Sequence, residues 1–170
     1  IAEAVQLPVL LYNVPGRTGV DLANETIARV AKHPNIVGIK DATGDMARVS
    51  WMRTHVEGRF DLISGDDPSY LGYLAHGGHG VISVTSNVAP EAMVALHDAV
   101  QAGDLESARL WQDRLIDLHK ALFLDNSPAP AKYALASLGV CSEEVRLPLA
   151  PTADAVKPAI DRAMKAAGVQ

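Results

Sequence analysis

The chain has 170 residues, of which 48% are hydrophobic and 21% charged, a composition typical of a globular domain with a buried core. Fifteen Lys and Arg residues against twenty Asp and Glu residues give a net charge of −5 without a basic run, so no nucleic-acid partner is predicted. A single cysteine excludes an intrachain disulfide and favours a reducing compartment such as the cytoplasm. No apolar run approaches the length of a membrane span.

The first residues of the chain have the pattern of an element that is already under way. Residues 1–5 resemble the end of a helix, with neither an initiator Met nor the pattern of a signal peptide. The chain is also short for a closed eight-unit barrel, which needs about 250 residues. We therefore expect the sequence to be a piece of a longer protein.

Apolar runs alternate with helical patterns over residues 1–103. The predicted strands are residues 7–12, 36–40, 61–65 and 81–84. The predicted helices are residues 21–32, 46–56 with Asp45 as N-cap, 67–75 with Asp67 as N-cap, and one that begins at Pro90. Strands that alternate with helices in this way form βα units around a parallel sheet, which places the fold in the α/β class.

After residue 103 the strand pattern stops. Helices are predicted over residues 104–123, 127–138 and 152–166, the last of them capped by Thr152. The apolar residues of the first helix recur three and four apart, which indicates core packing rather than a cofactor site. They are Ala108, Trp111, Leu115, Leu118 and Leu122. We expect two regions, 1–103 with the βα units and 104–170 as a helical region.

A lysine ends the second predicted strand. Residues 36–39 form an apolar run typical of a strand buried on both faces, and Lys40 follows at its carboxyl end. Active sites of parallel α/β folds are built at this edge, where an amine kept from water is favoured in its uncharged, nucleophilic form. Taken alone, Lys40 is better explained as a side chain that reaches past the strand to water or to a nearby carboxylate.

Two further side chains strengthen the catalytic interpretation of this lysine. Tyr12 ends the preceding strand, so its hydroxyl could approach the Lys40 amine and carry the protons that Schiff-base chemistry moves. Arg17, on a Pro-Gly turn shortly afterwards, offers a planar fork suited to a carboxylate. Singly, Tyr12 could be a rim aromatic and Arg17 a solvated loop charge. Together the three residues predict a site for a carbonyl substrate that carries a carboxylate.

Two other motifs are assigned no ligand. His76 and His79 could be taken for metal ligands, but no third ligand stands at a recognisable spacing, so no metal site is predicted. The glycine cluster of residues 77–80 precedes a strand, whereas a phosphate-binding loop precedes a helix. We therefore predict neither a metal ion nor a nucleotide.

Four segments closely resemble the dihydrodipicolinate synthase family, within the N-acetylneuraminate lyase superfamily, in the family's order and at its spacing. They are YNVPGRTG (12–19), GIKDATG (38–44), SGDD (64–67) and GGHGVISVT (77–85). The resemblance implies a (β/α)8 TIM barrel. Of this barrel the chain would hold the C-terminal half-barrel, four βα units, plus a C-terminal α-helical extension.

The resemblance also implies a reaction and roles for the site residues. The reaction is the condensation of pyruvate with aspartate semialdehyde to 4-hydroxy-tetrahydrodipicolinate, in lysine and diaminopimelate biosynthesis. Lys40 matches the lysine that forms a Schiff base with pyruvate, and Tyr12 matches the tyrosine that donates and accepts protons. Arg17 matches the arginine that holds the carboxylate of the second substrate, and Gly65 and Ile82 match substrate-binding positions. The family implies no cofactor beyond the covalent Schiff base, no membrane partner and a homotetramer.

Two alternatives stay open beside this interpretation. One is another pyruvate-dependent lyase or aldolase of the superfamily, similar to N-acetylneuraminate lyase or to a 2-keto-3-deoxy acid aldolase. Arg17 favours the synthase, because the sister enzymes usually lack Arg-Thr-Gly after the proline turn. The other is a catalytically incomplete half-barrel that acts as an assembly module.

The chain departs from the family's pattern in its extent. The family's first four βα units are missing, and with them the threonine that passes protons to the tyrosine. We therefore expect the 170 residues alone to be inactive. We also expect the open sheet to favour self-association.

Overall fold

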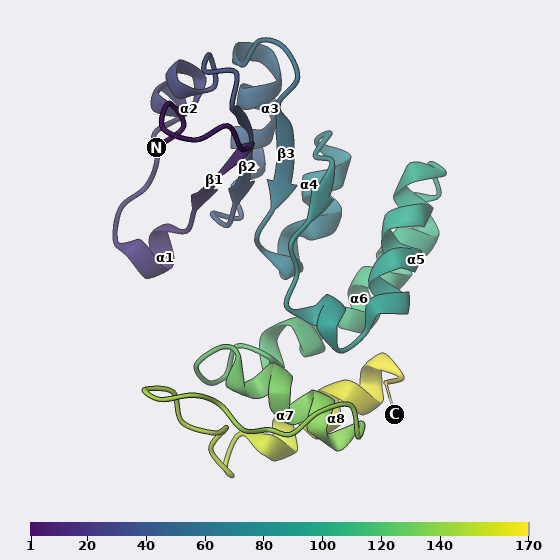
Figure 1. Cartoon of the computed structure of the whole chain (residues 1–170). Helices are drawn as coiled ribbons and strands as arrows, with labels where there is room; N and C mark the ends of the chain where they lie inside the picture. The colour runs from purple at the N-terminus through teal and green to yellow at the C-terminus, as the bar shows by residue number, and fades with distance from the viewer. Residues whose placement is uncertain (170) are drawn as a thin grey trace. The chain divides into compact units, whose positions relative to one another are not determined.

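The structure, a computed structural model, describes residues 1–169 and forms two compact units, Ile1–Ile82 and Ser83–Gln170. The first unit contains the sheet and the helices that alternate with its strands, and the second unit is helical (Figure 1). The division into 1–103 and 104–170, which follows the pattern of strands along the sequence, stays a prediction.

The sheet of the first unit is parallel and follows the order of the sequence. Within residues 1–169 its strands are β1 (Val9–Asn13), β2 (Ile36–Asp41), β3 (Asp61–Ser64) and β4 (Gly80–Val81). The connecting elements are α1 (Pro15–Thr18), α2 (Asn24–Val30), α3 (Met46–His55), the 3-10 turn η1 (Asp67–Ser69) and α4 (Tyr70–Ala75). The predicted α/β class is confirmed.

The core of the first unit lies between the sheet and its helices. Its buried residues come from every layer: Ile27 of α2, Ile39 of β2, Val49 and Met52 of α3, Phe60, Leu62 of β3 and Tyr73 of α4. Each fully buried Ile or Leu contributes roughly 1.5–3 kcal/mol through its removal from water. Because side chains alternate along a strand, the inward direction of Ile39 turns Lys40 to the opposite face of the sheet.

The second unit is built on helices. They are the 3-10 turn η2 (Thr85–Asn87), α5 (Pro90–Gln101), α6 (Leu105–Ala121), α7 (Ala129–Ser137) and α8 (Lys157–Ala167). The predicted apolar stripe of α6 is confirmed, since Leu115 and Leu118 are fully buried. Asp104 caps α6 by accepting a hydrogen bond from the backbone N–H of Ser107 at 3.0 Å. Hydrogen bonding with Ser107 also holds the pKa of Asp104 below its usual value.

The fourth predicted strand is too long. β4 ends at Val81 rather than at Val84, because the chain turns there into η2. The Ser83 hydroxyl accepts a hydrogen bond from the backbone N–H of Ser86 at 2.8 Å, which closes the turn and removes residues 83–84 from the sheet.

Two predicted helix caps are wrong. Asp66, not Asp67, caps η1, where its carboxylate accepts a hydrogen bond from the backbone N–H of Ser69 at 3.2 Å. Thr152 caps no helix, because α8 begins only at Lys157, with a proline in its first turn. Proline fits that turn because its missing N–H has no partner inside the helix.

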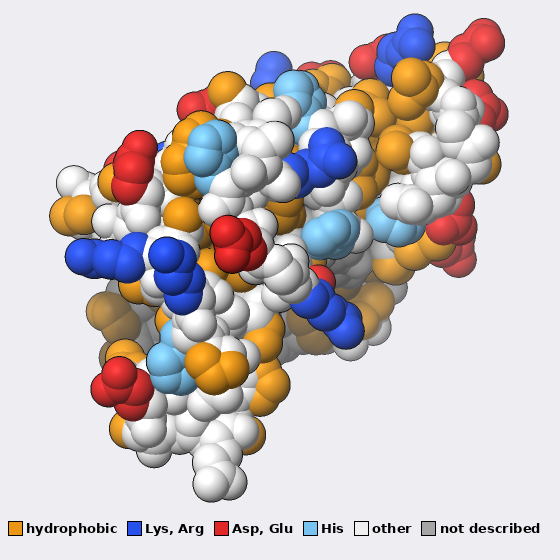
Figure 2. Space-filling view, turned by 90° about the horizontal axis from the view of Figure 1, so that it is seen from above, with side chains coloured by type: hydrophobic (Ala, Val, Ile, Leu, Met, Phe, Trp, Pro, Cys, Tyr) orange, Lys and Arg blue, Asp and Glu red, His pale blue; other side chains and the backbone are white. Residues whose placement is uncertain are grey.

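The surface carries no extended patch of a single charge on the face drawn in Figure 2. Acidic, basic and histidine side chains are interspersed there with hydrophobic and uncharged ones, as expected for a net charge of only −5. Among residues 1–169, no helix is long and apolar enough to cross a membrane.

Candidate active site

Lys40 and Tyr12 lie side by side at the carboxyl edge of the sheet. The register pairs Tyr12 of β1 with Lys40 of β2, so both side chains leave the same face. Lys40 Nζ lies 4.2 Å from the centroid of the Tyr12 ring, which is a cation–π contact. Tyr12 is 52% exposed and Lys40 is only partly buried, so the pair is accessible to a ligand. The structure brings these two predicted residues together, and their roles stay predictions.

Backbone hydrogen bonds extend the sheet past its last strand residues. The N–H of Gly65 donates to the carbonyl of Asp41 at 2.8 Å, and the N–H of Ile82 donates to the carbonyl of Ser64 at 2.9 Å. Both predicted substrate-binding positions therefore follow the ends of their strands, each two residues beyond the residue of its strand that lies in the row of Lys40.

Gly65 leaves room for the Lys40 side chain. A β-carbon placed at Gly65 would lie 2.9 Å from Lys40 Cε and 3.1 Å from Lys40 Cγ. Such distances are inside van der Waals contact for carbon atoms, which is optimal at about 3.5–4.0 Å. The aliphatic part of Lys40 thus packs directly on the backbone of the residue that follows β3.

Arg17 lies on the segment that follows β1. It belongs to the short helix α1, which has Pro15 in its first turn and ends at Gly19 in the left-handed conformation, with φ of 70°. The Arg17 side chain is exposed. Among residues 1–169 no hydrogen bond or ion pair joins Arg17 to Lys40 or Tyr12, so no polar contact connects it to the pair.

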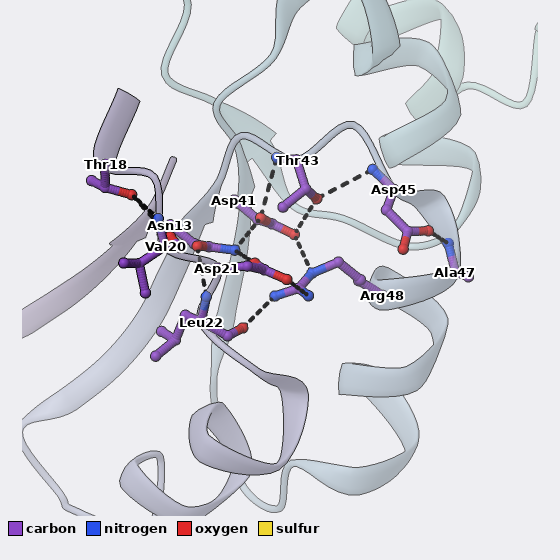
Figure 3. A network of polar contacts seen from close by, with 10 residues as sticks. All are labelled: Asn13, Thr18, Val20, Asp21, Leu22, Asp41, Thr43, Asp45, Ala47 and Arg48. Carbon is purple, nitrogen blue, oxygen red and sulfur yellow. Dashed lines mark hydrogen bonds and ion pairs between the residues drawn. The ribbon is translucent and has the colours of Figure 1, made fainter. Parts of the chain in front are cut away.

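A buried polar cluster lies on the opposite face of the same strand ends (Figure 3). We call it the Arg48 network, and its members are Asn13, Asp21, Leu22, Asp41 and Arg48. Arg48 of α3 donates to Asp41 and to Asp21, each at 3.2 Å. Asn13 donates to the same two carboxylates, at 3.2 Å and 2.8 Å. Asn13, Asp41 and Arg48 are buried. Their cluster was not predicted from the sequence.

The sequence nevertheless contains a signal for this network. Asn13 and Asp41 each directly follow the predicted site residue of their strand, so they face the helices when the site residues face away. Arg48 stands four residues before Met52 and shares the apolar face of α3. A charged side chain on such a face requires buried partners.

The two histidines near β4 have structural contacts. His79 Nδ1 accepts a hydrogen bond from the backbone N–H of Leu62 at 3.0 Å, which joins the loop before β4 to β3. His76 Nδ1 lies 3.0 Å from the hydroxyl oxygen of Ser50. In the part of the chain that the structure describes, no group of three or more His, Cys, Asp or Glu side chains is placed to hold a metal ion.

The fold and this site define a class of protein. It is the class of parallel α/β barrels, represented here by half of a barrel with a lysine and a tyrosine paired at the carboxyl ends of its strands. The model of the Dihydrodipicolinate synthetase family matches residues 1–167, and the chain belongs to this family. The family expected from the four sequence segments is confirmed.

Curated relatives carry one enzyme name. The chain is 55% identical over 169 residues to 4-hydroxy-tetrahydrodipicolinate synthase of Phenylobacterium zucineum and 59% identical over 171 residues to that of Hyphomonas neptunium. Each match covers 99% of this chain. The chain spans only 58% of the length of both relatives.

Solved structures of the family share the fold. A chloride-inhibited dihydrodipicolinate synthase from Acinetobacter baumannii, in complex with pyruvate, is 44% identical and superposes with a TM-score of 0.94, over 99% of this chain and 58% of the other. The dihydrodipicolinate synthase of Thermotoga maritima is 39% identical with a TM-score of 0.94, over 100% of this chain and 59% of the other. The predicted half of a TIM barrel followed by helices is thereby confirmed.

Proposed function

We propose that this chain carries the Schiff-base site of a 4-hydroxy-tetrahydrodipicolinate synthase, a lyase that condenses pyruvate with aspartate semialdehyde. The observation that carries the proposal is the contact between the Lys40 amine and the Tyr12 ring at the carboxyl edge of a parallel sheet. The names of the two curated relatives and the pyruvate bound by the enzyme from Acinetobacter baumannii support it.

The first half of the proposed reaction takes place on Lys40. Its uncharged amine attacks the keto carbon of pyruvate, and loss of water from the resulting carbinolamine leaves an imine. The Tyr12 side chain touches the lysine, so a small rotation of the flexible lysine brings the amine to the phenol. Tyr12 then supplies the proton that leaves with the water.

The second half forms the carbon–carbon bond. Tyr12, which has lost its proton to the departing water, takes a proton from the methyl group of the bound pyruvate, which gives an enamine. The terminal carbon of the enamine attacks the aldehyde carbon of the second substrate, and the aldehyde oxygen takes the proton from Tyr12 to become the hydroxyl group of the product. The amino group of that substrate then displaces Lys40 at the imine carbon, which closes the ring and frees the lysine. Arg17 pairs with the carboxylate of the aldehyde, and Gly65 and Ile82 contact the substrates.

We also propose the cofactor use, the pathway, the compartment and the oligomeric state of the complete enzyme. Lys40 forms the covalent intermediate itself, so the reaction uses no bound cofactor. The product serves lysine and diaminopimelate biosynthesis in the cytoplasm, and the complete enzyme is a homotetramer.

Trapping of the imine tests this function. The longest natural form of the protein is incubated with pyruvate and sodium borohydride, and the product is analysed by intact-mass and peptide mass spectrometry. We expect a reduced pyruvate adduct on Lys40, its absence in Lys40→Ala and its retention in Lys32→Ala, which removes an exposed lysine of the same unit.

The outcome separates the proposed enzyme from the alternative of an assembly module. An adduct on Lys40, followed by turnover with aspartate semialdehyde, supports the synthase. A folded protein that forms no adduct overturns it and leaves a half-barrel without Schiff-base chemistry.

A further inference from the structure

The strand ends that carry Tyr12 and Lys40 have a second face. The register pairs Tyr12 with Lys40 and, one residue later, Asn13 with Asp41. Successive side chains of a strand point to opposite faces, so Asn13 and Asp41 face the helices. Both are only 2% exposed. Each site residue is therefore one peptide bond away from a buried polar anchor.

Arg48 binds three groups at once on this face. Its Nε donates to Asp41 at 3.2 Å, its Nη1 donates to Asp21 at 3.2 Å, and its Nη2 donates to the carbonyl of Leu22 at 2.7 Å. The planar guanidinium presents its donors in a fixed fork. Its side chain is 8% exposed, so helix α3 presents this fork to Asp41 largely away from water.

Asn13 closes the network from the side of β1. Its amide N–H groups donate to Asp21 at 2.8 Å and to Asp41 at 3.2 Å, and its carbonyl oxygen accepts from the backbone N–H of Leu22 at 3.1 Å. Residues 13 and 21–22 are thereby held together. The segment between them is a closed loop, and Arg17 lies on it.

We propose that Arg48 is a positioning residue that fixes Lys40 through Asp41 and fixes the Arg17 loop through Asp21 and Leu22. This inference rests on the proposed function, because it assigns a role within the same site. Asp41 also accepts hydrogen bonds from the backbone N–H and the hydroxyl of Thr43, at 3.3 Å and 3.1 Å. The Asp41 carboxylate therefore connects the end of β2 both to Arg48 and to the turn that follows the strand.

Stability alone does not account for such a cluster. A buried ion pair often contributes no more to stability than apolar side chains of the same volume, because removing the charges from water offsets their attraction. Beyond what apolar packing provides, the polar cluster fixes the relative orientation of the elements that it joins. Hydrogen bonds fix the angles and distances between β1, β2, α3 and the loop, and a misplacement of about 1 Å at a reacting group can cost roughly a hundredfold in rate.

The network has two arms that can be separated by substitution. Asp41 connects Arg48 to the strand of Lys40 and is buried, whereas Asp21 connects Arg48 to the Arg17 loop and its side chain is 52% exposed. Loss of Asp21 leaves the contact between Arg48 and Asp41 intact. We therefore expect its main effect on the binding of the second substrate.

The test compares three variants in the longest natural form of the protein. Arg48→Lys keeps the positive charge but cannot reach three partners, and Asp21→Ala removes the carboxylate of the loop arm but leaves the hydrogen bond from Arg48 to the Leu22 carbonyl. Arg53→Lys is the matched control, because Arg53 lies on the same helix, is exposed and donates only to the carbonyl of His76 within residues 1–169. The rate of borohydride-trapped pyruvate adduct reports on Lys40, and the KM for aspartate semialdehyde reports on Arg17.

The expected pattern differs for each variant. Arg48→Lys slows adduct formation at least roughly tenfold and raises the KM for the aldehyde, while circular dichroism shows a folded protein. Asp21→Ala raises the KM roughly fivefold or more but leaves the adduct rate within about twofold. Arg53→Lys changes neither quantity by more than about twofold.

The other outcomes contradict either the proposed function or one part of the role proposed for Arg48. A wild-type protein without an adduct overturns the proposed function itself. An adduct in the wild type, with unchanged rate and KM in folded Arg48→Lys, overturns the positioning role only. If Arg48→Lys does not fold, Asp21→Ala decides, and an unchanged KM in that variant refutes the role of the contact between Arg48 and Asp21 in holding the loop.

Discussion

Gly65 determines the path of the Lys40 side chain. Because a β-carbon at this position would lie 2.9 Å from Lys40 Cε and 2.9 Å from Ala42 Cβ, Gly65→Ala displaces the lysine, and the chain just after it, from the contact with Tyr12. We expect the trapped pyruvate adduct to form roughly ten to a hundred times more slowly in Gly65→Ala, since the amine leaves its aligned position. The measurement is the time course of adduct formation by intact-mass spectrometry.

Gly80 provides the control for this substitution. It lies on β4 of the same sheet, and a β-carbon placed there would have Ile63 Cδ1 as its nearest neighbour at 3.9 Å, an ordinary van der Waals contact. Gly80→Ala should keep the adduct rate within about twofold. Equal rates in both variants and the wild type would mean that the lysine reaches pyruvate along another path.

At the residue scale the sequence predicted part of the site. Tyr12 and Lys40 were predictable as neighbours, because the length of an apolar run places its last residue at the strand end and a parallel sheet aligns those ends. The contacts of Arg48 were not, because Asp21 lies in an irregular segment and its position depends on how the loop closes. The periodicity of hydrophobic residues in a helix does not predict how a loop outside that helix folds back on it.

Helix α4 brings two tyrosines into the interior of the first unit. Tyr70 and Tyr73 are both 2% exposed, and burial raises the pKa of Tyr70 to about 12. Burial also raises the pKa of Tyr73, with a further increase from Asp41 and an opposing effect of Arg48. Within residues 1–169 the Tyr73 hydroxyl has no hydrogen-bond partner.

These tyrosines predict a loss of stability at alkaline pH. In the unfolded chain a tyrosine ionises near pH 10, whereas in the folded protein both keep their protons to higher pH. Their contribution is therefore fully present below about pH 10 and is lost as the pH rises toward about 12, because only the unfolded state releases its protons there. Tyr73→Phe should make this loss shallower and should raise the free energy of unfolding at neutral pH by about 1 kcal/mol.

Urea unfolding at about pH 8 and about pH 11 measures both effects. The wild type and Tyr73→Phe are compared at each pH by circular dichroism. An identical decrease between the two pH values in both proteins would contradict the role of Tyr73. A clear destabilisation of Tyr73→Phe near neutral pH would show that its hydroxyl is hydrogen-bonded in solution.

At the scale of elements, the order of strands and helices was predictable and several ends were not. Hydrophobic periodicity identified the alternation of βα units because each element buries one face. The end of β4, the cap at Asp66 and the start of α8 at Lys157 were set by local hydrogen bonds and by a proline in the first turn. Neighbouring residues of similar type can each serve as a cap or as the last residue of an element. A sequence pattern therefore predicts the ends of helices and strands only to within a few residues.

The whole chain contains two sets of buried apolar residues. The cluster around Ile39 and Met52 belongs to the unit Ile1–Ile82, and Leu115 of α6 is fully buried in the unit that begins at Ser83. Each unit also contains one tryptophan, Trp51 on α3 and Trp111 on α6. Fluorescence can therefore follow each unit separately once the other tryptophan is replaced by phenylalanine.

Leu115→Ala tests whether the two units unfold independently. Removing a fully buried leucine costs about 2–5 kcal/mol in the unit that contains it. We expect a lower urea midpoint reported by Trp111, in a Trp51→Phe background, and a smaller decrease reported by Trp51, in a Trp111→Phe background. Leu110→Ala is the control, since Leu110 lies on the same helix and is 65% exposed. Equal decreases at both tryptophans would show that the chain unfolds as one cooperative body, with the βα units and the helices depending on each other for their stability.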